Sequence, residues 1–333
     1  GSLKLLLPLG LFAFLLWNVD PNDYYVFWQQ PKRWGLLILA QLVALLAFTL
    51  SFLRWGLLVR AFDIPFTSRE CLRLGFLGHL LNFISFGSVG GDLFKAVLVA
   101  RDKPQRRPEA VASVLVDRAI GLLGLILLAW LSIEFFGQSP LPPFLSGLRT
   151  VAGGLTIVAI VSLLLAIYAG AWFDRLVDHF ERIPVVGESL VRMARAVRML
   201  RARSWVVPSM LIMSLAVQGM LSVSVYLISH GIYVSAPNMR EHMMVVPPAM
   251  AAGALPIAPG GLGIQEGALA GMFSLLAALP DGFSGMLVAT VYRLVTIAIA
   301  GVGVVFYAAS HGREFQFMGS SLRSPATTHD QIG

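Results

Sequence analysis

Six ionisable side chains lie inside long apolar stretches of this chain. In a membrane each such group costs roughly 2.5–3.5 kcal/mol at the centre of a helix, so it normally faces protein or a water-filled cavity. The six are Asp92, Lys95, Asp117, Arg118, Glu266 and Arg293. They could be structural ion pairs, with Asp92 or Asp117 neutralising Arg118. We favour a functional site, because two arginines in matching places exceed what packing requires.

The acids and arginines recur at nearly equal spacing in two parts of the chain. Asp92 precedes Arg118 by 26 residues, and Glu266 precedes Arg293 by 27. The strings VLVDRAIGLLG (114–124) and TVYRLVTIAIAG (290–301) around the arginines are also loosely similar. Repeats with interrupted helices in corresponding positions indicate a transporter-type site near the bilayer midplane.

A glycine pair precedes each acid. The two pairs are Gly90-Gly91 and Gly260-Gly261. A half-helix that begins at Gly91 or Gly261 would point free N–H groups and a positive dipole end towards the bilayer interior. Phosphate binds at such ends, although the glycines could serve only a tight turn. The acids could instead satisfy the dipole themselves, carry a proton or coordinate a coupling cation.

The candidate substrate-binding residues all belong to these matched segments. They are Asn82, Gly90, Gly91, Asp92, Lys95, Asp117, Arg118, Gly260, Gly261, Gln265, Glu266, Tyr292 and Arg293. No metal site is predicted, because the chain has one cysteine and its six histidines show no ligand spacing. No catalytic motif and no cofactor motif is found.

The composition places these residues in a membrane protein. Only 13% of the residues are charged, against about 25% in soluble domains. Apolar runs near the roughly 20 residues that cross a bilayer predict full spans. They lie at about 3–19, 34–58, 109–136, 148–170, 206–229 and 284–310.

The positive charges lie in alternate loops between the apolar runs. The stretches 54–73, 101–109 and 171–205 are basic, whereas 137–147 carries no charge. Basic loops stay cytoplasmic, so we expect a multi-pass protein of the plasma membrane with both termini inside. The net charge of +7 therefore reflects topology, and nucleic acid is not an expected partner.

Two apolar stretches return to the side from which they start. The stretch 74–100 lies between two cytoplasmic loops and is interrupted by FGSVGGD (86–92); 243–279 lies between two outside loops and is interrupted by LPIAPGGLG (255–263). Both are predicted to be re-entrant helical hairpins, since Gly and Pro end one half-helix before the next begins.

The expected fold is therefore an all-α polytopic membrane protein with about six full spans and two re-entrant hairpins. Its single transmembrane domain covers 1–317, with an inverted-topology repeat of about 34–136 and 206–310. The segment 171–205 is predicted to be cytoplasmic, basic and amphipathic, and 318–333 a disordered tail.

Three motifs resemble one known family. They are Asn82 with GSVGGDLFK (87–95), VDR (116–118) with its following glycine, and PGGLGIQEG (259–267). The chain resembles, over about 3–312, the flippase-like transmembrane family named after the lysylphosphatidylglycerol synthase membrane domain. The resemblance is to the stand-alone form without the synthase domain. Lys95 stands where many relatives carry arginine, which keeps the charge but loses the bidentate fork.

The resemblance implies a lipid transporter or flippase for an anionic phospholipid or lipid-phosphate. Membrane lipids with anionic headgroups are the expected partners, with Arg118, Arg293 and Lys95 facing the phosphate. Two alternatives remain open. One is an integral-membrane enzyme that uses a polyprenyl-phosphate-linked donor, with Asp92 or Glu266 as acid or base. The other is a scaffold for a separately encoded lipid synthase.

Overall fold

The computed structural model describes residues 25, 27–84, 90–137, 140–168, 200–254, 263–276 and 278–309. All regular elements in this part are helices, and five are long and apolar enough to cross a membrane. They are α3 (Trp34–Ala61), α6 (Arg107–Phe136), α7 (Pro143–Tyr168), α10 (Val206–Ile232) and α13 (Gly285–Ala309). The expectation of an all-α polytopic membrane protein is confirmed, and these helices begin and end within a few residues of five predicted spans.

Several predictions fall outside the described residues. They concern the first span (3–19), the tail (318–333), most of the basic segment 171–205, and the pair Gly260-Gly261. These stay predictions.

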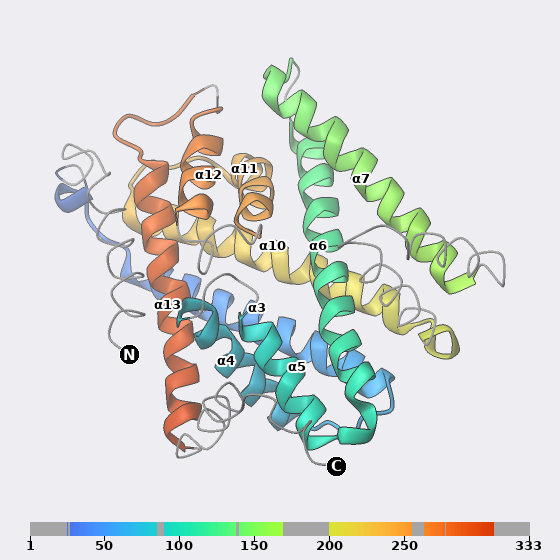
Figure 1. The fold of residues 1–333 in the computed structure, drawn as a ribbon. Helices are drawn as coiled ribbons and strands as arrows, with labels where there is room; N and C mark the ends of the chain where they lie inside the picture. Colours follow the sequence, from blue (N-terminus) through green and yellow to red (C-terminus); the bar gives the residue numbers. More distant parts are fainter. Residues whose placement is uncertain are drawn as a thin grey trace, which may run out of the picture.

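Four shorter α-helices form two hairpins. They are α4 (Ser68–Ile84), α5 (Gly90–Asp102), α11 (Met239–Gly253) and α12 (Ile264–Phe273). Each is shorter than the roughly 20 residues that cross a bilayer. Figure 1 shows α4 and α5 at one end of the bundle and α11 and α12 at the opposite end. This arrangement agrees with hairpins that enter from opposite faces, although the membrane side of each stays a prediction.

Corresponding helices of the two predicted halves make corresponding contacts. Helix α3 packs against its counterpart α10. The hairpin arm α4 packs on α13, just as α11 packs on α6, and α5 contacts α6 as α12 contacts α13. Helix α7 lies outside this exchange, against α6 (Figure 1). These contacts agree with a two-fold relation between 34–136 and 206–310, which stays a prediction.

The first arms of both hairpins begin with the same reciprocal cap. The Thr67 hydroxyl accepts from the Glu70 N–H at 3.2 Å, and the Glu70 carboxylate accepts from the Thr67 N–H at 2.8 Å. Asn238 and Glu241 make the same pair of bonds at 3.1 and 2.6 Å. Such a box satisfies two helix-start N–H groups at once. This cap is a further match between the two halves, beyond the glycine pairs, acids and arginines.

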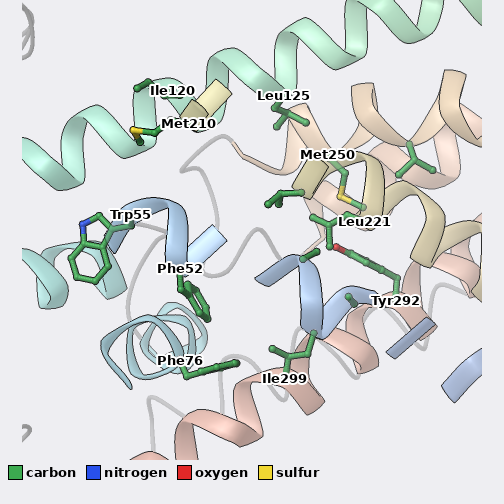
Figure 2. Packing of buried hydrophobic residues seen from close by; sticks show 14 of the residues in the cluster. Phe52, Trp55, Phe76, Ile120, Leu125, Met210, Leu221, Met250, Tyr292 and Ile299 are labelled. Atoms are coloured by element: carbon green, nitrogen blue, oxygen red, sulfur yellow. The ribbon is translucent and has the colours of Figure 1, made fainter. Parts of the chain in front are cut away.

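Small residues allow the central helices to approach closely. Ala40, Ala44 and Ala47 form one fully buried row of α3, and the Ser224 hydroxyl of α10 donates to the Ala40 carbonyl at 3.0 Å. Small side chains favour such close packing between membrane helices. Towards the other end of α3, Phe52 and Trp55 fill the apolar core beside the first hairpin (Figure 2).

Candidate functional site

Asp92 is the centre of a three-charge cluster in the first half. It is the third residue of α5, and its Oδ1 atom lies 3.1 Å from the Lys95 Nζ atom one turn later. Its Oδ2 atom accepts from the Nε atom of Arg118, which α6 supplies. One carboxylate thus binds two cations, and these three residues carry a formal charge of +1. We call them the first-half cluster.

The start of α5 is held by Asn82 and Gly91. The Asn82 side-chain oxygen accepts from the Gly91 N–H at 2.9 Å, which caps the half-helix as N-cap side chains do. A Cβ atom on Gly91 would lie 1.9 Å from the Gly78 carbonyl oxygen. Gly91 therefore lets the hairpin arms touch, and Asn82 binds the protein backbone here.

Lys95 is held between the acid and two aromatic rings. Its ammonium lies 5.7 Å from the ring centroid of Phe52 and 5.4 Å from that of Trp55. Both distances are within the range of a cation–π attraction. The Lys95 side chain is only 12% exposed, whereas the Arg118 side chain is 44% exposed. Arg118 is therefore the accessible cation of the first-half cluster.

Asp117 does not join this cluster, although it precedes Arg118. Its two carboxylate oxygens accept from Nε and Nη2 of Arg54 at 3.0 and 3.1 Å. Arg54 also donates to the Ser214 hydroxyl, so the pair joins α3, α6 and α10. The side chains of consecutive helix residues point about 100° apart. Asp117 and Arg118 therefore face different neighbouring helices. Of the two acids considered for Arg118, Asp92 is its partner.

Arg54 is buried, although its position in the basic stretch 54–73 predicted a cytoplasmic loop. Its side chain is 7% exposed, and a Cβ atom on Gly121 would lie 3.0 Å from its Nη2 atom. The sequence did contain a sign of this burial, because the predicted membrane span 34–58 includes Arg54. A charge within a span indicates a nearby partner.

The second half contains a similar acid–arginine ion pair, and here both side chains are buried. Glu266 is the third residue of α12, and its Oε1 atom accepts from the Nε atom of Arg293 on α13. The Gln265 side-chain oxygen lies 3.3 Å from the Arg293 Nη2 atom. The side chains of Arg293 and Glu266 are 4% and 2% exposed. These two ionic groups balance each other, and we call them the second-half pair.

Gly263 begins the second half-helix. Its φ of +83° lies in the region that favours glycine, and its N–H donates to the Glu266 Oε2 atom at 2.8 Å. The expectation that this half-helix begins at Gly261 is wrong, because α12 begins at Ile264, directly after Gly263. The acid itself satisfies the helix start, which was one of the alternatives for Glu266.

The two halves differ at two matched positions beside the bridge. Lys95 follows Asp92 by three residues, and Leu269 follows Glu266 by three. Leu269 is fully buried, so the second half lacks the extra cation. Tyr292, the counterpart of Asp117, is buried in the apolar core (Figure 2).

The structure therefore brings each acid to the arginine of its own half. The transporter-type site near the bilayer midplane stays a prediction, because the described contacts join Asp92 to Arg118 and Glu266 to Arg293 but not the first-half cluster to the second-half pair. Among the described residues, no group of three or more His, Cys, Asp or Glu side chains could hold a metal ion.

The helices and the charges within them define a polytopic α-helical membrane protein with paired acid–arginine bridges. The chain belongs to the family of the lysylphosphatidylglycerol synthase TM region, whose family model matches residues 2–303. Searches of curated proteins and of solved structures gave no match.

Proposed function

We propose that this protein is a lipid transporter that binds an anionic phospholipid or lipid-phosphate and moves it between leaflets. The proposal depends chiefly on Arg118, a 44% exposed arginine in a cluster of formal charge +1. Arg118 lies eleven residues into α6, about 16 Å from the start of the helix. The helix is longer than the roughly 30 Å hydrocarbon layer and begins with the polar residues Arg107 and Glu109, so we place Arg118 within this layer.

A lipid phosphate suits this position for two reasons. An exposed charge at this depth is stabilised by an anion, and guanidinium groups bind phosphate through charge-assisted hydrogen bonds. A phospholipid also brings apolar chains that remain in the bilayer. A free phosphate would have to leave water to reach the same depth.

We propose transport without bond chemistry. Asp92 and Glu266 each accept from an arginine, and Glu266 also accepts from the start of its own half-helix. Carboxylates engaged in this way are poorly placed to act as a general acid or base on a lipid-phosphate donor. Purified protein with a labelled polyprenyl-phosphate-linked donor should therefore give no product.

Arg118→Gln is expected to abolish retention of anionic lipid while the protein still inserts and folds. The side chain is 44% exposed, so its loss removes the accessible cation but costs little stability. Native mass spectrometry of the purified protein would measure retained lipid, and a fluorescent-lipid assay in vesicles would measure leaflet exchange.

Arg149→Gln is the matched control. Arg149 is 41% exposed and lies 3.8 Å from Glu134, so the substitution removes the same charge at similar exposure. Lipid retention by Arg149→Gln should equal that of the wild type. Undiminished retention and exchange in Arg118→Gln would contradict the proposed function.

The proposed orientation places α4 and α5 towards the cytoplasm of a plasma membrane, and α11 and α12 towards the outside. A membrane-impermeant maleimide should label Asp281→Cys on intact cells, but label Arg106→Cys only after permeabilisation. The native Cys71 is fully buried, so the unmodified protein serves as the unlabelled control. Labelling of both variants from the same side would overturn the inverted arrangement.

A further inference from the structure

Arg118 lies within an exposed apolar row of α6. Val111, Leu115 and Leu122 are all exposed and share one helix face with Arg118, at intervals of four, three and four residues. A face of this kind in a membrane helix contacts acyl chains. The arginine interrupts it eleven residues into the helix.

A second exposed row begins beside the Asp92–Arg118 bridge. Leu93 follows Asp92 directly, is 63% exposed, and is joined one turn later by the exposed Val97. Helix α5 packs against α6, so each helix that supplies a residue of the bridge also carries an exposed apolar row. We call Leu93, Val97, Val111, Leu115 and Leu122 the α5/α6 face.

Helix α7 provides the contrasting surface. Val151, Ile157 and Val158 are exposed, and residues 150–168 contain no ionisable side chain except Tyr168. This α7 face can contact any lipid of the bilayer without preference for its headgroup. It differs from the α5/α6 face in lacking a charge.

We infer that the α5/α6 face is a binding site for one phospholipid, which enters laterally from the bilayer with its phosphate against Arg118 and an acyl chain along the five apolar residues. This rests on the proposed function and specifies the substrate as a lipid that carries both a phosphate and an acyl chain. The formal charge of +1 in the first-half cluster complements the phosphate. The flanking apolar side chains exclude water around it, which strengthens the charge interaction.

The whole protein would be reconstituted in vesicles of phosphatidylcholine with a minor fraction of phosphatidylglycerol that carries a diazirine on its acyl chain. After irradiation, peptide mass spectrometry compares adducts on the α5/α6 face with adducts on the α7 face. The expected result is a several-fold excess on the α5/α6 face. The excess should disappear in Arg118→Gln, persist in Arg149→Gln, and be absent with a diazirine diacylglycerol, which has no phosphate.

The other outcomes separate this inference from the proposed function. Equal labelling of the two faces, with lipid retention that still depends on Arg118, overturns the lateral site and leaves the proposed function standing. An equal excess with the diacylglycerol probe shows ordinary lipid contact and also overturns the site. An excess unchanged by Arg118→Gln, together with unchanged retention, overturns both.

Discussion

Arg293→Gln is expected to lower the free energy of unfolding by about 3–5 kcal/mol, because it leaves the Glu266 carboxylate buried without its ionic partner. Both side chains are almost fully buried, at 4% and 2% exposure. Burial removes the water that would otherwise solvate the remaining charge. The measurement is unfolding in mixed micelles, followed by circular dichroism as the denaturing detergent increases.

The double variant Glu266→Gln/Arg293→Gln is the control. It removes both charges together, and the amide oxygen introduced by Glu266→Gln can still accept from the Gly263 N–H, so most of the lost stability should return. Arg118→Gln provides a second comparison, because its half-exposed pair should change the free energy of unfolding by no more than about 1 kcal/mol. Equal losses in Arg118→Gln and Arg293→Gln would contradict the difference in burial.

This difference in burial gives the two halves separate roles in the proposed transporter. The acid–arginine bridge occurs in both, each time from the third residue of a half-helix to the next long helix. In the first half, Lys95 adds a cation and Arg118 is accessible; in the second, Leu269 adds only apolar packing. The first half is therefore suited to bind an anion, and the second half to hold the bundle together.

The long helices and the matched positions of the acids and arginines could be predicted from the sequence. Hydropathy identifies spans because every backbone group in lipid must be paired within the helix. The matched spacing of 26 and 27 residues indicated corresponding positions in the two halves. It left the partner of Arg118 open between Asp92 and Asp117, and the folded contacts join Arg118 to Asp92 and Arg293 to Glu266.

The partner of Asp117 and the degree of burial could not be predicted in this way. Arg54 lies 63 residues from Asp117 and meets it only after α3 and α6 pack. The exposure of Arg118 likewise depends on which helices cover it. Gly263 was missed because its positive φ is a property of the folded turn, whereas the preceding Gly-Gly pair gives a more obvious sequence signal.

Gly91→Ala is expected to disrupt the first hairpin, to abolish lipid retention and to lower the stability of the protein. The added Cβ atom would lie 1.9 Å from the Gly78 carbonyl oxygen and 2.6 Å from the Asn82 side-chain oxygen. Backbone cannot rotate aside, so the arms must separate, and overpacking of this kind costs typically about 1–3 kcal/mol and sometimes more. Separation also breaks the cap from Asn82 and moves Asp92 away from Arg118.

Gly267→Ala is the matched control for this change. Gly267 lies in α12, the corresponding half-helix, and a Cβ atom there meets nothing within 4 Å. Alanine is also the better helix former by roughly 0.8–1 kcal/mol, so Gly267→Ala should be as stable as the wild type or slightly more so. Thermal unfolding and native mass spectrometry of both variants decide the point. If Gly91→Ala unfolds and binds lipid like Gly267→Ala, the arms of the first hairpin do not touch at Gly78, and Asp92 does not depend on that contact for its position beside Arg118.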